Sequence, residues 1–283
     1  MIDFSINAEL ELTDCSGELW INGIPIEGQQ TRRPLFEVSV GVHHLLVPGT
    51  NTLELWVDVE GIPRDYLRPR DAPAREKAHA VGRLVRYPAG VMANPDNGQV
   101  LAEIEYRGKF DDSKQAPRVV HGAVDLGAAF GAWSWQSAPL ISPQKAAGTF
   151  ELDDATRREA ESLLEDVHTA LFSGDADRML ELVKVRWEEM DRAWPGRNDA
   201  EDRARHAAFL SRVAADPRKR VPLNRVKHDF RIVGNGRLLE CIDVDFMPSI
   251  RIAQEVEPDR WALAPYAVTM ARVGPNGRLA VVR

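Results

Sequence analysis

Residues 19–60 contain three apolar segments separated by turn signals, and this order limits the fold more than any other feature of the chain. Asn22-Gly23, the strongest short hairpin signal, interrupts the first segment. The turn Pro48-Gly49-Thr50-Asn51 precedes the third segment. Residues 3–12 alternate apolar and polar side chains, as a half-buried strand does. Residues 19–60 therefore predict strands of one sheet of a β-sandwich.

The length and a change of period predict two domains. A chain of 283 residues exceeds the usual size of one compact core. Strand signals continue through residues 99–106 and recur in RVVHGAVDL and WSWQSAPLI, and residues 142–148 have linker composition. Helical periodicity begins after Leu152. We expect a mixed fold, with an all-β sandwich at 1–148 and an α+β domain at 151–283.

The second domain is expected to begin with two or three helices and to end in a curved antiparallel sheet. Apolar residues at helical spacing form one stripe along the first helix: Ala160, Leu163, Leu164, Val167 and Leu171. Ser173-Gly174-Asp175 ends this helix and caps a second one that runs to Trp194. Asn198 and Glu201 resemble a capping box at the start of a third helix, which Asp216-Pro217 terminates.

The stretch from Pro63 to Pro88 carries four prolines and seven basic residues, which predicts a long loop with one helical turn near residues 75–80. Arg68 and Arg70 are our candidates for a partner surface on this loop. Such cations suit a phosphate or an acidic partner. Pairing with carboxylates of the same chain explains them equally well.

Composition excludes several classes of function. The net charge of −7 argues against a nucleic-acid-binding surface over the whole protein. The N-terminus has no signal-peptide pattern, and no apolar stretch reaches the roughly 20 residues that span a bilayer. We therefore expect a cytoplasmic protein without membrane or nucleic-acid partners. Two isolated cysteines, Cys15 and Cys241, predict neither a disulfide framework nor a zinc site.

Trp20 and Trp56 lie on the polar faces of their predicted strands. Glu18 and Asn22 flank the first indole, and Glu54 and Asp58 flank the second. If the two strands share a sheet, both indoles lie on one surface, where a sugar or a protein partner would stack. Coverage by the loop 63–88 or by the second domain is the alternative, because large aromatic side chains seldom stay exposed without a use.

Five residues of the second domain are candidates for lining a ligand pocket: His168, Trp187, His228, Asp243 and Tyr266. On a strand, Asp243 shares a face with Asp245, and such a carboxylate pair suits acid–base chemistry if the face lines a cavity. A solvated outer face is the alternative for that pair. His168 and His228 are equally consistent with hydrogen-bonded core histidines.

The first domain resembles the galactose-binding-like jelly rolls attached to β-galactosidases and related glycosidases. The resemblance depends on the strand with Asn22-Gly23 and on the element that runs from His44 through Pro48-Gly49 and Asn51 to Leu53. It implies a jelly-roll fold and no particular ligand, since many members of the family bind no sugar.

The second domain resembles the ketosteroid-isomerase-like or SnoaL-like cone fold. There, a first helix ends in a short turn with the sequence Gly-Asp before a second helix begins, and Gly174-Asp175 occupies that place. The strands that follow fit the curved sheet of a cone. The long third helix and the basic segment through Lys219-Arg220 depart from the simplest version of this fold.

No phosphate, nucleophile or metalloprotease motif is present, and His43-His44 on a strand would point to opposite faces. We expect no catalytic residue, no metal and no cofactor. The first hypothesis is a non-catalytic binding protein with a protein partner, such as a bacterial immunity or accessory protein. The alternative is a cone-fold protein or enzyme with a small-molecule pocket in the second domain; a sugar ligand fits either hypothesis.

Overall fold

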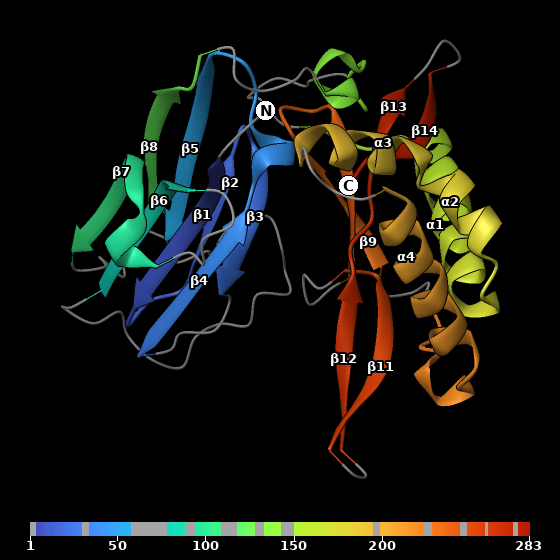
Figure 1. The fold of residues 1–283 in the computed structure, drawn as a ribbon. Coiled ribbons are helices and arrows are strands. Elements are labelled where there is room, and N and C mark those ends of the chain that lie inside the picture. The colour runs from blue at the N-terminus through green and yellow to red at the C-terminus, as the bar shows by residue number, and fades with distance from the viewer. Residues whose placement is uncertain are drawn as a thin grey trace. The chain divides into compact units, whose positions relative to one another are not determined.

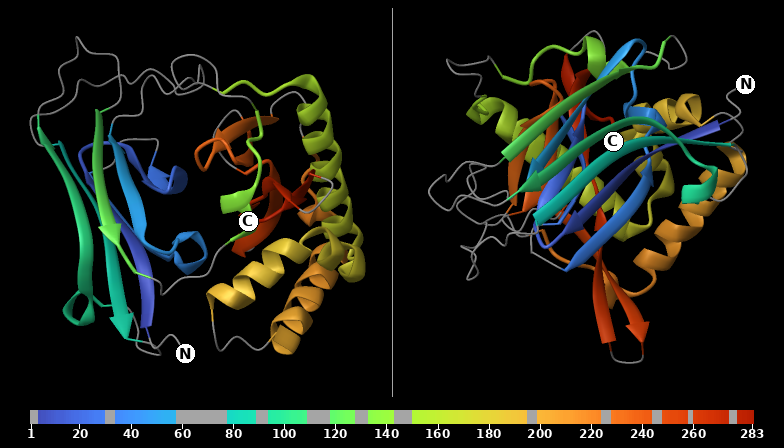
Figure 2. Two further views of the ribbon diagram at one scale, coloured as in Figure 1. Left: turned by 90° about the horizontal axis from the view of Figure 1, so that it is seen from above. Right: turned by 90° about the vertical axis from the view of Figure 1, so that its left-hand side faces the viewer.

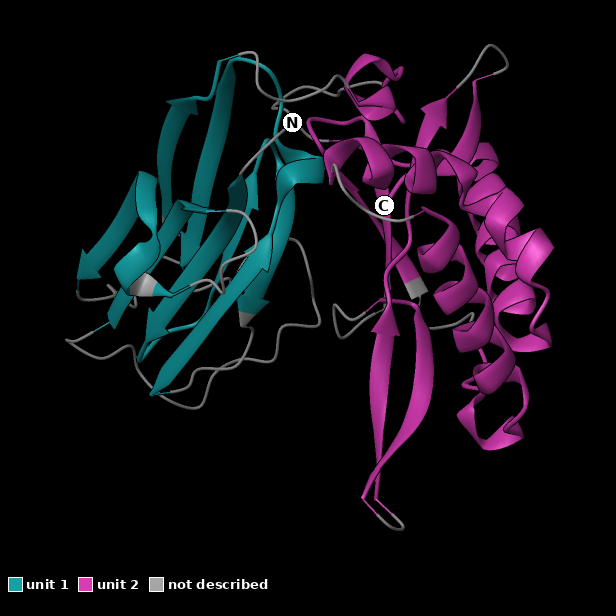
Figure 3. Cartoon of the chain, in the orientation of Figure 1, with its two compact units in different colours: residues 1–132 teal, residues 133–283 magenta. Residues whose placement is uncertain are grey.

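A computed structural model describes residues 4–29, 34–57, 78–88, 94–108, 118–127, 133–142, 150–194, 199–223, 228–243, 248–257, 260–273 and 277–283. The chain forms two compact units, residues 1–132 and 133–283 (Figure 3). Among the described residues, the first unit consists of antiparallel sheets, and the second combines four α-helices with antiparallel strands (Figure 1).

One four-stranded sheet of the first unit, here called sheet A, has the order β4-β1-β6-β7. Its strands are Leu35–Gly41 (β4), Phe4–Thr13 (β1), Ala78–Pro88 (β6) and Gln99–Gly108 (β7). Along β1, buried side chains alternate with half-buried ones, and Ile6, Ala8, Leu10 and Leu12 form the buried row. One face of sheet A therefore belongs to the core.

The second sheet, sheet B, has the order β3-β2-β5-β8. Its strands are Ile24–Gln29 (β3), Gly17–Ile21 (β2), Thr50–Val57 (β5) and Arg118–Asp125 (β8). Sheets A and B face each other (Figure 2). A Cβ atom on Gly82 of β6 would lie 2.7 Å from Leu19 of β2, so glycine allows this close approach between the sheets.

Two buried asparagines join the turns that flank β2 and β5. Asn22, at φ 54°, and Gly23, at φ 72°, form the tight turn between β2 and β3. The side chain of Asn22 donates a hydrogen bond to Oδ1 of Asn51 at 2.9 Å. Asn51 is fully buried and also accepts from the backbone N–H of Val47. The two segments on which the jelly-roll resemblance depends are therefore in direct contact.

Three expectations about the first unit are wrong. Residues 78–88 form strand β6 in the interior of sheet A rather than a loop, because Ala78, Ala80, Val81, Leu84 and Val85 are buried. The run 19–60 does not lie in one sheet, since β4 pairs with β1 of sheet A. His43 and His44 lie on a 3₁₀ helix, η1 (His43–Leu45), rather than on a strand.

The second unit begins with the 3₁₀ helix η3 (Ser134–Ser137), where a strand was expected. Four helices follow: Asp154–Ser173 (α1), Ala176–Leu182 (α2), Lys184–Ala193 (α3) and Asp199–Ala214 (α4). The expected single helix from 176 to 194 is divided at Val183, which is buried at φ −101°. The contacts of η3 assign it to the second unit. The domain boundary that the sequence places near residue 148 stays a prediction.

Gly174 sets the junction between α1 and α2. It ends α1 in the left-handed conformation at φ 73°, and the carboxylate of Asp175 accepts the backbone N–H of Arg178 as the N-cap of α2. The apolar stripe of α1 faces the core, and Ala160, Leu164, Val167 and Leu171 are fully buried. The helical periodicity of the sequence therefore identified the correct buried face of α1.

The strands of the second unit form two groups. A four-stranded sheet has the order β14-β13-β10-β9, with strands Arg278–Val281 (β14), Thr269–Val273 (β13), Leu238–Asp243 (β10) and His228–Val233 (β9). Ile250–Glu257 (β11) and Arg260–Tyr266 (β12) form a separate two-stranded sheet. This hairpin extends beyond the four-stranded sheet of its unit (Figure 1). We call it the arm.

Two short 3₁₀ helices complete the described elements: η2 (Pro95–Asn97) and η5 (Pro217–Lys219). In the described part of the chain, every helix falls short of the length and apolar character that crossing a membrane requires.

Candidate functional site

Trp20 and Trp56 lie side by side on sheet B. Their strands are neighbours, and the ring centroids are 5.4 Å apart with 29° between the ring planes. The register places Glu18 opposite Trp56 and Glu54 opposite Trp20. The two indoles therefore share one face of the sheet, as the sequence analysis expected for neighbouring strands.

Each indole of this pair donates its N–H to a carboxylate of its own strand. Trp20 Nε1 lies 2.9 Å from Oε2 of Glu18, and Trp56 Nε1 lies 3.0 Å from Oε2 of Glu54. Trp20 is only 9% exposed, whereas Trp56 is half-buried. A partner would therefore meet mainly Trp56, and the role of the pair in binding stays a prediction.

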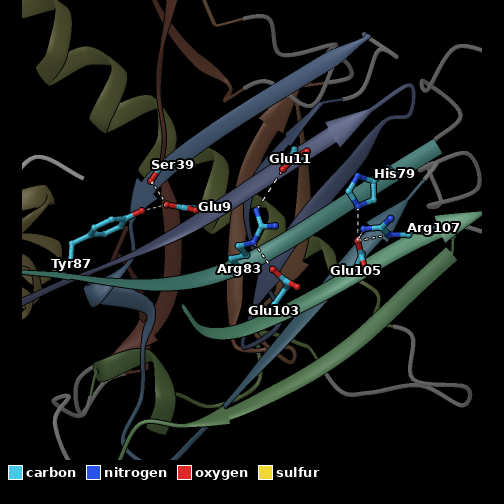
Figure 4. A network of polar contacts seen from close by, with 9 residues as sticks. All are labelled: Glu9, Glu11, Ser39, His79, Arg83, Tyr87, Glu103, Glu105 and Arg107. Atoms are coloured by element: carbon cyan, nitrogen blue, oxygen red, sulfur yellow. Dashed lines mark hydrogen bonds and ion pairs between the residues drawn. The ribbon is translucent and has the colours of Figure 1, made fainter. Parts of the chain in front are cut away.

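Polar side chains connect all four strands of sheet A across its outer face (Figure 4). Arg83 of β6 binds Glu103 of β7 at 2.6 Å and Glu11 of β1 at 3.6 Å. Nε2 of His79 lies 2.7 Å from Oε1 of Glu105. Hydrogen bonds from His79 and then from Arg107 hold the pKa of Glu105 below its usual value. These pairs are accessible to solvent and fix the register of the strands more than they add stability.

Tyr87 lies at one end of this network. Its hydroxyl donates to Glu9, whose Oε1 also lies 3.5 Å from the hydroxyl of Ser39. Burial, followed by the hydrogen bond to Glu9, raises the pKa of Tyr87 to about 12. The phenol stays protonated at neutral pH and acts as a hydrogen-bond donor between strands β6 and β1.

His168 is a buried histidine of α1. It is 6% exposed, its Nε2 lies 2.8 Å from the carbonyl oxygen of Val221, and its ring packs against Phe172. Burial lowers the pKa of His168, so the imidazole is neutral at pH 7. This geometry matches the interpretation as a hydrogen-bonded core histidine.

Trp187 lies near a second histidine, His206, that the sequence analysis missed. The ring of Trp187 lies 5.5 Å from that of His206 on α4, and the Trp187 N–H donates to Asp199 at 2.6 Å. The guanidinium of Arg186 lies 5.7 Å from the ring centre of Tyr266. Burial and the positive charge of Arg186 lower the pKa of His206. The structure therefore brings Trp187 together with His206, and Tyr266 with Arg186.

His228 and Asp243 occupy paired positions on β9 and β10. On the same face of these strands, Phe230, Leu239 and Cys241 belong to the core cluster that packs on α1. The side chains of these two residues, and Asp245, Arg68 and Arg70, lie outside what the structure describes.

A buried ion pair anchors the last residue of the chain to α3. Arg283 Nη1 lies 2.5 Å from Oε2 of Glu189, which is fully buried. The backbone N–H of Ser134 donates to the other oxygen of Glu189 at 2.6 Å. Burial lowers the pKa of Arg283 in spite of the carboxylate beside it. Ser134 and Arg283 satisfy the two oxygens of Glu189, so we interpret this cluster as structural.

Three large apolar side chains of the arm are exposed. The exposed fractions of these side chains are 53% for Val256, 36% for Trp261 and 51% for Leu263. At the base of the arm, by contrast, Ile250 and Ile252 are buried in the core. Sequence analysis predicted strands here but could not tell which of their apolar residues stay exposed.

Trp261 and Leu263 share one face of the arm. The register pairs Trp261 with Glu255 and Leu263 with Ala253, so these four side chains project to the same side. The guanidinium of Arg218, on η5, lies 5.0 Å from the ring centre of Trp261. We call this surface the arm face.

Among the described residues, no group of three or more His, Cys, Asp or Glu side chains is arranged to hold a metal ion. Comparison of the chain with family models, with curated proteins and with solved structures finds no match.

Proposed function

We propose that the protein is a non-catalytic binding protein that engages a protein partner. The observation that carries this proposal is the exposed arm face, with Trp261 and Leu263 on a hairpin that extends from the core. Contiguous apolar surface on a soluble protein generally marks an interaction site. An isolated two-stranded hairpin is marginally stable in water, so a partner that covers the arm would also stabilise it.

The finer assignments are part of the same proposal. A galactose-binding-like sandwich for the first unit is supported by the contact between Asn22 and Asn51. A cone-like fold for the second unit is supported by the Gly174-Asp175 junction and by the antiparallel sheet that follows the helices. A cytoplasmic bacterial immunity or accessory protein would combine such folds with an exposed docking surface.

A small-molecule site in the second unit is the second candidate function. Within the described residues, Nε2 of His206 is buried without a hydrogen-bond partner, although the imidazole lies beside Trp187 and Phe209. A polar ligand that donates to or accepts from this nitrogen would satisfy it. Titration of ¹⁵N-labelled imidazoles during a metabolite screen tests the idea, which fails if no compound shifts the His206 resonances.

Quantitative affinity capture tests the proposed function. The purified full-length chain is used as bait in native lysate of the source organism, and the captured protein is then reconstituted with the chain from pure components. We expect a complex of fixed stoichiometry that the double variant Trp261→Ser/Leu263→Ser loses. A matched control, Leu35→Ser/Val100→Ser, removes two apolar side chains that are each 53% exposed on sheet A and should retain the complex.

Equal capture by wild type and arm variant would contradict the proposal. A chain that forms no reconstitutable complex but turns over a metabolite would contradict it more strongly and favour the second candidate.

A further inference from the structure

The second unit contains an indole, a carboxylate and a guanidinium that bind one another. The indole N–H of Trp187 donates to Oδ1 of Asp199 at 2.6 Å. The same carboxylate accepts a hydrogen bond from Nε of Arg203 at 2.8 Å, and the guanidinium of Arg203 lies 5.5 Å from the ring centre of Trp187. The cation is therefore stabilised both by the carboxylate and by the negative face of the indole ring. We call this arrangement the indole triad.

Sheet B repeats the first two members of the indole triad. The indole N–H of Trp56 donates to Oε2 of Glu54 at 3.0 Å. Both side chains are half-buried and lie on the opposite face of β5 from the buried row Leu53, Leu55 and Val57. Within the described residues, no guanidinium or ammonium group lies over the ring of Trp56 or within ion-pair distance of Glu54. The cation of the triad is therefore absent from the part of the chain that the structure describes.

The neighbouring strand enlarges this surface with a second indole and a second carboxylate. Trp20 of β2 stacks on Trp56 and donates its N–H to Glu18 at 2.9 Å. Glu18 lies directly opposite Trp56, and Trp20 lies directly opposite Glu54. Indoles and carboxylates thus alternate on two adjacent strands. We call these four residues the indole surface.

The charge of sheet B suits a cation at the indole surface. Its described strands carry four carboxylates and two basic side chains: Glu18, Glu27, Glu54, Asp125, Arg118 and His121. His121 lies opposite Glu54 in register without forming an ion pair with it, and Arg118 lies opposite Val57. On the outer face of sheet A, by contrast, Glu103 and Glu105 bind cations of their own sheet (Figure 4). The carboxylates of sheet B are thus available to a cation from outside the sheet.

We propose that Trp56 and Glu54 bind an arginine side chain in a basic segment of a partner protein. The guanidinium lies over the indole and donates to the carboxylate, as Arg203 does in the indole triad. Arginine suits this site better than lysine, because its planar guanidinium stacks on an aromatic ring and donates several hydrogen bonds in one plane. The site belongs to the first unit, and the inference does not depend on the arm face.

Other occupants suit the indole surface less well. In a two-fold dimer the same surface meets itself, so the carboxylates of two copies would lie close together and repel. A sugar also stacks on an indole ring, but it carries no charge to match the carboxylates. Dependence on a positive charge therefore separates the proposed occupant from a sugar.

Titration of the full-length ¹⁵N-labelled chain with two matched peptides tests the proposal. One peptide alternates glycine with arginine, and the other replaces each arginine by citrulline, which has a similar shape but no charge. At pH 8 we expect the arginine peptide to shift the indole N–H signal of Trp56, which a Trp56→Phe variant identifies. The citrulline peptide should leave this signal in place, and added salt should weaken the binding of the arginine peptide.

Variants separate the two members of the site. Glu54→Gln keeps an acceptor for the indole N–H and should weaken binding about threefold. Trp56→Leu removes the aromatic ring and should weaken binding by a similar factor. As controls, Glu37→Gln makes the same charge change at an exposed position of β4 in sheet A, and Trp261→Ser/Leu263→Ser alters the arm face. Both controls should bind the arginine peptide as the wild type does.

Every contrary result overturns the inference in a different way. A citrulline peptide, or methyl β-galactoside, that shifts the Trp56 signal as far as the arginine peptide does would exclude a site for a cation. Equal weakening by Glu37→Gln and Glu54→Gln would leave only a general attraction between opposite net charges. Absence of any shift would remove the site. Loss of binding in the arm variant would place the peptide on the arm and support the proposed function, whereas the other contrary results leave the proposed function unchanged.

Discussion

Glu189 shows how a single residue holds several elements of the second unit together. From α3 it accepts the backbone N–H of Ser134 on η3 and pairs with Arg283 at the end of the chain. Arg192 lies within 3.7 Å on the same helix. A buried carboxylate is stable only when such partners replace its lost hydration.

We predict that Glu189→Gln destabilises the second unit by about 3–5 kcal/mol, because it leaves the Arg283 guanidinium buried without its counter-ion. Differential scanning calorimetry should show the transition of that unit at a lower temperature. Glu188→Gln, the neighbouring exposed position on α3, should change the stability by no more than about 0.5 kcal/mol. Similar transition temperatures for the two variants would show that the buried ion pair adds little to the stability of the second unit.

His168 predicts a loss of stability on mild acidification. Burial keeps its pKa in the folded protein below that of the unfolded chain. The unfolded chain therefore binds more protons once the pH falls below about 6.5, and the free energy of unfolding decreases. Above that pH both states are neutral at this residue and the effect vanishes.

The measurement is chemical denaturation at pH 7.5 and pH 5.5 for the wild type and for His168→Gln. Glutamine does not titrate, and its amide can still donate to the carbonyl of Val221. We expect the variant to lose less stability than the wild type between the two pH values. An identical loss in both proteins would remove His168 from the pH response.

At the scale of elements, local chemistry predicted turns and helix faces better than it predicted strand partners. Asn22-Gly23 forms the expected tight turn, and Gly174 ends α1 as expected. Both depend on backbone conformations that few residues adopt. The pairing of β4 with β1, by contrast, depends on contacts between segments that are distant in the sequence. Apolar and polar residues alternate with a period of two in either sheet, so this alternation does not identify the sheet that a strand joins.

Strand β6 and the break at Val183 show why other elements could not be predicted. Prolines and cations upstream of residue 78 suggested that the loop continued, although Ala80, Val81 and Leu84 provide the burial of a central strand. Between α2 and α3 the helical spacing of apolar residues persists through the break, so periodicity alone gives no sign of it.

The candidate site was predictable only where neighbours in space follow from strand order. Trp20 and Trp56 were expected on one face and stack there. The arm face was not predicted, because the exposure of Trp261 depends on how far β11 and β12 extend beyond the core that buries Ile250 and Ile252.

A test at the scale of elements concerns the junction of α1 and α2. Gly174→Ala forces alanine into a left-handed conformation and brings its Cβ to 2.9 Å from that of Ala214 on α4. Gly277→Ala carries the same kind of strain at φ 57° but meets no atom of the described residues within 4 Å. We predict that both are destabilising, with a loss of about 1 kcal/mol or more for Gly277→Ala and a larger loss for Gly174→Ala. Urea denaturation of the two variants checks the order, and equal losses would show that α1, α2 and α4 adjust without cost.

At the scale of the whole molecule, the exposed apolar side chains of the second unit point to the arm. Trp261 and Leu263 are exposed on the arm, and the guanidinium of Arg218 lies 5.0 Å from the ring centre of Trp261. Each unit has its own compact set of contacts, and the arm is the part of the second unit that extends from its core. We therefore place the binding function of the molecule on the arm.

Hydrogen exchange of the arm tests this placement most directly. In the free protein, amides of residues 260–264 should exchange faster than those of β10, because the arm is a two-stranded hairpin outside the core. On addition of the captured partner we predict slower exchange in residues 250–266 and 217–220. Unchanged exchange in both segments of a saturated complex, with protection elsewhere, would contradict the account.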